Sequence, residues 1–197
     1  MSGKFTWRNV ADQPSRIFTC GYCGHYISSS VGYSQGVNQD GSGQSNGHIY
    51  ICHHCAKPTY LTSGGQWPGC PFGEDVSGIT DHGVEALYAE ARHAYSQNAF
   101  TAAVLCCRKL LMHIAVAKGA KSGESFVSYV SFLADEGYVP RDAKAWVDVI
   151  RQKSNEANHE IIVMTADDAR DLISFITMLL KLVFEFPSRI PTRAPQA

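Results

Sequence analysis

Apolar residues recur at helical spacing at the start of the second part of the chain. In segment 81–98 they lie three or four residues apart, at Val84, Leu87, Tyr88, Ala91 and Tyr95. This spacing predicts an amphipathic helix. Segment 99–118 is apolar on most sides and is followed by Gly119, a residue that suits a helix end. We expect 99–118 to be the central helix of a bundle.

Three further segments have the same period and predict helices over 124–137, 140–153 and 165–186. Pro140 suits the first turn of the second of these helices. Thr165 can cap the last one through its hydroxyl group, and Pro187 is expected to stop it. Together the segments predict a mainly α protein with a five-helix bundle.

Residues 1–80 show little helical periodicity and are rich in Gly, Ser, Tyr and Cys. Five glycines and many polar residues predict a flexible loop over 28–47, and a Gly/Pro-rich connector follows over 62–75. The pattern therefore divides the chain into a small β or loop module over 1–80 and a helical bundle over 81–187. The last residues, 188–197, are rich in proline and are predicted to be a disordered tail.

Composition and charge restrict the possible functions. The 197 residues are 45% hydrophobic and 18% charged, which is enough apolar material for a buried core. Residues 1–80 carry four basic and four acidic side chains, and the remainder carries thirteen and fourteen. Neither part is basic, so strong nonspecific binding to DNA is not expected.

The apolar runs do not predict a membrane protein. The N-terminus lacks the long apolar stretch of a signal peptide. The run 172–186 is shorter than the roughly 20 residues that a bilayer requires, and it carries Lys181 and Glu185. We expect a cytoplasmic protein with no membrane segment.

The cysteines give the strongest chemical signal in the sequence. Two CxxC pairs, Cys20 with Cys23 and Cys52 with Cys55, are separated by 28 residues. Each pair can supply two thiolates from one turn, and four thiolates form the tetrahedral site that a single structural Zn²⁺ prefers. The flanking pattern resembles a zinc ribbon. Because four cysteines close the site, we expect no catalytic position on the metal.

Two interpretations of this zinc module remain open. In the first, zinc only holds together a small domain that lacks a large core. In the second, the module also contacts nucleic acid or a protein partner, with four tyrosines as candidates for base stacking: Tyr22, Tyr26, Tyr33 and Tyr50. His25, His53 and His54 flank the pairs and could replace a cysteine, but four thiols already complete the site.

The helical part resembles a domain-of-unknown-function family that is related to the HEPN helical domains. The resemblance covers about 84–186 and rests on ALYAEARHAYSQNAFTAAVLCCRKLL, SFVSYVSFLADEGYVP, IRQKSNEANHE and TADDARDLISFITMLLKL. The family's Arg…Asn…His run corresponds to Arg151, Asn155 and His159, and the Arg of its second helix corresponds to Arg108. Members often carry an N-terminal cysteine-rich ribbon, as this chain does.

The resemblance implies a candidate active site, because many HEPN domains are metal-independent ribonucleases that act as dimers. In such a site His159 would move a proton of the RNA, and Arg151 or Arg108 would stabilise the phosphate. This sequence departs from the pattern, because Ser154 occupies the position of the motif Arg. Arg151, Asn155 and His159 nevertheless lie four residues apart, so a continuous helix would bring them to one face.

A structural interpretation competes with catalysis for this cluster. Asn155, Asn158 and His159 can bind backbone carbonyl groups at a helix end, with Arg108 as a buried counterpart. We therefore expect a non-catalytic, zinc-binding HEPN-like protein that forms homodimers through its helices. It would act as an interaction or nucleic-acid-associated module, in a prokaryotic defence or toxin-related system. The alternatives are a metal-independent endoribonuclease with RNA as its substrate, and a structural subunit of a larger assembly with a protein partner.

Overall fold

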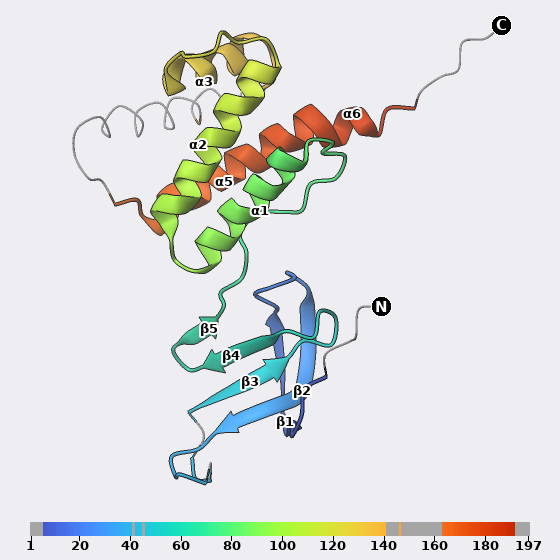
Figure 1. Cartoon of the computed structure of the whole chain (residues 1–197), viewed down its shortest axis with the longest axis vertical. Coiled ribbons are helices and arrows are strands. Elements are labelled where there is room, and N and C mark those ends of the chain that lie inside the picture. Colours follow the sequence, from blue (N-terminus) through green and yellow to red (C-terminus); the bar gives the residue numbers. More distant parts are fainter. Residues whose placement is uncertain (1–5, 41, 45, 141–145, 147–162, 192–197) are drawn as a thin grey trace, which may run out of the picture. The chain divides into compact units, whose positions relative to one another are not determined.

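The computed structural model describes residues 6–40, 42–44, 46–140, 146 and 163–191. The chain divides into two compact units, Met1–Pro71 and Phe72–Ala197, which we call the sheet unit and the helical unit (Figure 1). Of the predicted tail, residues 188–191 are described. The first unit ends nine residues before the change in composition at residue 80.

The sheet unit is built from five antiparallel strands. In chain order they are β1 (Ala11–Thr19), β2 (Tyr26–Gln35), β3 (Gly47–Ile51), β4 (Pro58–Thr62) and β5 (Gly65–Trp67). The order in the sheet is the order in the sequence, so every strand pairs with its neighbour along the chain. The protein is therefore a mixed α and β structure, and the prediction of a mainly α fold is wrong.

Strand β2 corrects the loop that was predicted over 28–47. Its first half alternates exposed and buried positions, and the buried residues of the whole strand include the small residues Ser29 and Gly32. The Ser29 hydroxyl donates a hydrogen bond of 3.0 Å to the carbonyl of Ile51, so this polar group is satisfied inside the sheet. A Cβ atom at Gly32 would lie 1.8 Å from the carbonyl oxygen of Ile49, so the close strand approach requires glycine.

The helical unit contains four long helices in its described residues: α1 (His82–Ser96), α2 (Phe100–Ala117), α3 (Phe126–Asp135) and α5 (Ala166–Leu180). These confirm four of the five predicted helices. The fifth, predicted over 140–153, lies outside the described residues apart from Pro140 and Trp146. Trp146 packs edge-on against Phe175 of α5, with ring centroids 5.5 Å apart.

The beginning of α5 has a clear sequence cause, whereas its end differs from the prediction. Thr165 caps the helix as predicted, and it forms a reciprocal capping box with Asp168. At the other end α5 continues as a π-helical turn, Lys181–Glu185, and then as α6 (Phe186–Ser188). The helix therefore ends one residue after Pro187 and not before it.

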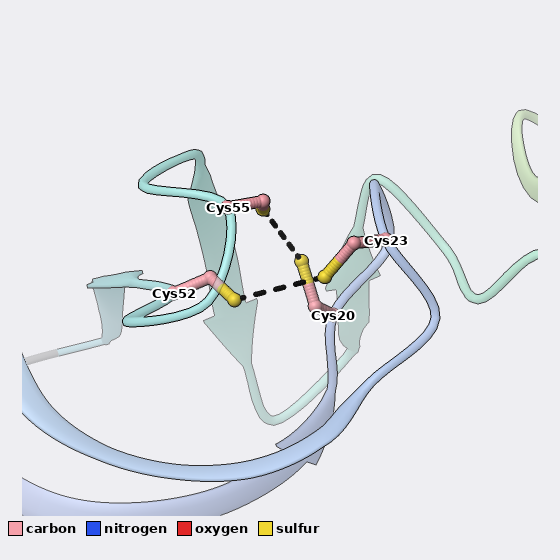
Figure 2. A group of neighbouring side chains, drawn as sticks. All are labelled: Cys20, Cys23, Cys52 and Cys55. Atoms are coloured by element: carbon pink, nitrogen blue, oxygen red, sulfur yellow. Dashed lines mark hydrogen bonds between the residues drawn. The ribbon is translucent and has the colours of Figure 1, made fainter. Parts of the chain in front are cut away.

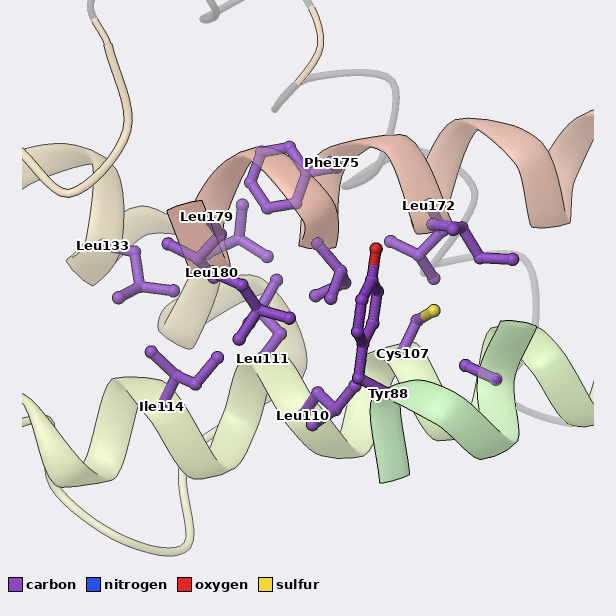
Figure 3. Close-up of a cluster of buried hydrophobic side chains, with 14 of the residues drawn as sticks. Tyr88, Cys107, Leu110, Leu111, Ile114, Leu133, Leu172, Phe175, Leu179 and Leu180 are labelled. Atoms are coloured by element: carbon purple, nitrogen blue, oxygen red, sulfur yellow. The ribbon is translucent and has the colours of Figure 1, made fainter. Parts of the chain in front are cut away.

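A single apolar core joins the four helices (Figure 3). Its completely buried side chains include Leu111, Leu133, Phe175 and Leu180. Among the described helices, α2 is the one that is long and apolar enough to cross a membrane. Seven of its residues are buried in this core. The core helix of a globular protein meets the same criterion, so α2 is only a weak indication of a membrane span.

Residues 72–79 pack along the helices and belong to the helical unit. Phe72, Val76 and Ile79 contact the apolar core. Arg92 of α1 donates hydrogen bonds to the carbonyls of Phe72 and Gly73, at 3.0 and 3.1 Å. These contacts hold the segment on α1 without regular secondary structure of its own.

The far end of this segment is held by a buried carboxylate. Glu185, which is only 7% exposed, accepts a hydrogen bond of 3.1 Å from the Ser77 amide and pairs with Arg189 at 2.6 Å. A buried carboxylate without such partners would cost several kcal/mol. The two contacts therefore explain how an acid is accommodated at this position.

The hydroxyl group of Tyr88 should make a measurable contribution to the stability of the helical unit. It is buried, donates to the carbonyl of Glu74 at 2.8 Å and lies 2.6 Å from the hydroxyl of Thr177. We expect Tyr88→Phe to lower the free energy of unfolding by about 1–2 kcal/mol, because the Glu74 carbonyl loses its donor. Denaturant unfolding followed by helical circular dichroism measures this. Tyr138→Phe keeps the ring that lies under Lys118 and is the control, and equal losses would contradict the prediction.

Candidate metal centre

The four cysteines lie in two similar turns of the sheet unit. Cys20 and Cys23 occupy the turn between β1 and β2, and Cys52 and Cys55 occupy the turn between β3 and β4. In each turn the residue after the second cysteine donates its amide to the carbonyl of the first: Gly24 to Cys20 at 2.9 Å and Ala56 to Cys52 at 2.8 Å. These bonds fold each CxxC segment into a knuckle that presents two sulfurs.

Gly24 and Ala56 both have positive φ angles, 69° and 56°. Glycine adopts this conformation without strain, whereas alanine does so at a cost. The Ala56 carbonyl accepts a hydrogen bond of 2.7 Å from the indole of Trp7, which helps to hold the second knuckle. The two knuckles thus have the same backbone shape despite different sequences.

The sulfur positions fit a single tetrahedral ion (Figure 2). The Sγ atoms of Cys20 and Cys55 are 3.7 Å apart, and those of Cys23 and Cys52 are 3.8 Å apart. All four sulfurs lie within 4.8 Å of one another. A tetrahedral ion with metal–sulfur bonds of about 2.3 Å requires sulfurs roughly 3.8 Å apart. The four cysteines are therefore positioned to bind one metal ion.

The protonation of the thiols differs within the cluster. Burial raises the pKa of Cys20, but backbone amides of Cys23 and Tyr22 donate hydrogen bonds to its sulfur and outweigh burial, so that the pKa falls to about 7. Burial raises the pKa of Cys55 to about 12. Because a metal binds thiolates, loading the site must release protons, and metal affinity should fall as the pH falls.

The tyrosines considered for base stacking are not equivalent. Tyr50 is 3% exposed and donates a hydrogen bond of 2.8 Å to the Pro14 carbonyl, so it is unsuited to stacking on a ligand. Tyr33 lies edge-on against the Trp7 ring. Tyr26 is 77% exposed, and Tyr22 is exposed with Lys57 over its ring. Of the four, Tyr22 and Tyr26 are therefore the exposed ones.

The sheet unit also contains a polar cleft that sequence reasoning missed. It has a volume of about 600 Å³ and is lined by residues of β1, β3 and β4, among them Ser15, Arg16, His48 and Thr62. Arg16 is the one charged side chain among the described lining residues. Because the lining is brought together from three strands, no short motif in the sequence could have revealed it.

Of the four candidate catalytic residues, the structure describes Arg108. Its guanidinium group lies over the ring of Phe126, 4.5 Å from the ring centre, and partial burial lowers its pKa. Arg108 therefore packs on an aromatic side chain of α3. Arg151, Asn155 and His159 lie outside the described residues, so the predicted cluster remains a prediction.

The fold and the site together define a two-unit protein, in which a sheet with a four-cysteine cluster precedes a helical unit. Comparison with known families then identifies the second unit. The family described as domain of unknown function DUF4145 matches residues 89–195, which is more than half of the chain, and the chain belongs to this family. Searches of curated proteins and of solved structures find no match.

Proposed function

We propose that this protein is a non-catalytic, zinc-binding interaction module of the HEPN-like class. The four-sulfur geometry carries the proposal. Thiolate ligands favour Zn²⁺, and four of them leave no open position at which a metal-bound water could react. Zinc then has a structural role, and the protein acts by binding partners on the surfaces of its two units. In this proposal the protein is cytoplasmic and forms homodimers through its helical unit.

We propose RNA as the partner of the sheet unit, in a defence-related or toxin-related setting. The cleft supports this choice, because its described lining offers Arg16, several hydrogen-bonding groups and no acidic side chain. Phosphate groups bind to such sites through the charge of arginine and through polar donors. The exposed rings of Tyr22 and Tyr26 add stacking surfaces on the same unit.

Replacing Arg16 should weaken the binding of single-stranded RNA. We expect Arg16→Gln to lower the slope of log affinity against log salt concentration by about one, because one phosphate contact is lost. Fluorescence anisotropy with a labelled oligonucleotide at several salt concentrations measures the slope. Arg8→Gln makes the same change of charge outside the described cleft lining and should have little effect. Equal effects of both substitutions would argue against the cleft as the RNA-binding site.

A metal-independent endoribonuclease is the alternative function, with His159 and either Arg151 or Arg108. The contact of Arg108 with Phe126 favours the non-catalytic proposal, because this arginine is engaged elsewhere. We expect wild type and His159→Ala to be equally inactive on a mixed RNA substrate in EDTA, after both are shown to be folded and to hold zinc. Cleavage by the wild type alone would establish the ribonuclease. Light scattering of the same samples tests the dimer.

A further inference from the structure

A second group of metal-binding side chains lies beside the four-cysteine cluster. One potential ligand atom from each of Cys23, His25 and His54 lies within 4.8 Å of the other two. The rings of His25 and His54 are stacked, with centroids 3.6 Å apart and an angle of 22° between the planes. The two knuckles thus bring one histidine each to the same place. Both histidines are exposed, so solvent ions can reach them.

A hydrogen bond selects the tautomer of one of these histidines. Nδ1 of His25 lies 3.1 Å from the carbonyl oxygen of Cys23. A carbonyl only accepts, so Nδ1 donates this bond, and in the neutral ring Nε2 then carries the lone pair. Histidines that bind metals are commonly fixed in this way, with the other ring nitrogen donating to a backbone carbonyl.

We infer that Cys23, His25 and His54 form an outer site for a second Zn²⁺ ion, with the Cys23 thiolate bridging it to the inner ion. Because the lone pair of a ring nitrogen lies in the ring plane, the two stacked rings must turn so that one nitrogen of each points at this ion. This inference rests on the proposed zinc at the four cysteines. A thiolate sulfur retains lone pairs after it binds one ion, and imidazole nitrogen is a preferred ligand of zinc. Three protein ligands leave at least one position for water, so the outer ion is exchangeable whereas the inner one is enclosed.

Zinc titration of the full-length protein tests the outer site. Metal-free protein is titrated against a chromophoric chelator, and native mass spectrometry counts the bound ions. We expect two ions for the wild type, the second at least tenfold weaker than the first, and one tightly bound ion for the His25→Ala/His54→Ala double variant. His53→Ala removes an exposed histidine of the same knuckle that is outside the group, and it should retain both ions.

Cobalt spectroscopy separates the two sites. The first equivalent of Co²⁺ should give the same thiolate charge-transfer bands in wild type and double variant, because the inner ligands are unchanged. A second equivalent should change the spectrum of the wild type alone. Binding of only one ion by the wild type would overturn the outer site and leave the inner one intact. Binding of none would overturn both, and loss of the first ion in the double variant would show that histidine belongs to the inner site.

Discussion

Removal of the metal is expected to unfold the sheet unit and to leave the helical unit folded. The reason is the size of the two cores. Among the described residues, the buried apolar core of the sheet unit consists of Phe18, Cys20, Ile27, Tyr50 and Cys52, and two of these five belong to the cysteine cluster. Structural zinc supplies about 10–16 kcal/mol of apparent binding free energy in small domains, which is comparable to the free energy of unfolding of a whole domain, about 5–15 kcal/mol.

Hydrogen exchange with mass spectrometry measures this outcome for each unit separately. After chelation, or in Cys52→Ser, we expect amides of β1 to β4 to lose protection while those of α1, α2 and α5 keep theirs. Cys70→Ser is the matched control, because Cys70 is exposed and outside the cluster. Protection of the strands in metal-free protein would mean that the five-residue core suffices without an ion.

Phe175→Ala should have the largest effect on the helical unit. The ring is completely buried in α5 and meets Trp146 edge-on, so its removal deletes the hydrophobic contribution and leaves a cavity. Such changes typically cost about 3–5 kcal/mol. We expect a loss of this size in the free energy of unfolding, measured by denaturant titration with helical circular dichroism.

Phe186→Ala is a matched control for this substitution, since Phe186 is the same residue type at 50% exposure. Its cost should remain below about 1 kcal/mol, as for most surface positions. Similar losses for both variants would mean that burial does not determine the effect. A loss of metal from Phe175→Ala would contradict the assignment of the metal to the separate sheet unit.

The helices and the metal ligands could be predicted from sequence because both depend on short-range spacing. Apolar residues three or four apart identify α1, and two CxxC pairs identify the four sulfurs before any fold is known. The cap at Thr165 is equally local, because its partner Asp168 is three residues away. Each of these signals is contained within one helix or one turn.

Strand β2 could not be predicted because the burial of its residues depends on contacts with residues that are distant in the sequence. Ser29 and Gly32 are typical of loops in composition, yet they are buried because Ile51 and Ile49 lie against them. The cleft depends in the same way on residues from three strands, such as Arg16, which no window of sequence contains together. A strand that is rich in small residues therefore has the composition of a loop, and only its pairing with other strands identifies it.

The order of the strands has a consequence for the speed of folding. Every pairing in the described sheet joins neighbours in the sequence, so each hairpin closes a short stretch of chain. Contacts of this kind form rapidly, since little entropy is lost in bringing the ends together. The cysteine cluster instead joins two turns that are 28 residues apart. The rate at which the sheet unit folds should therefore depend on the concentration of free metal ion as well as on the rate at which the hairpins form.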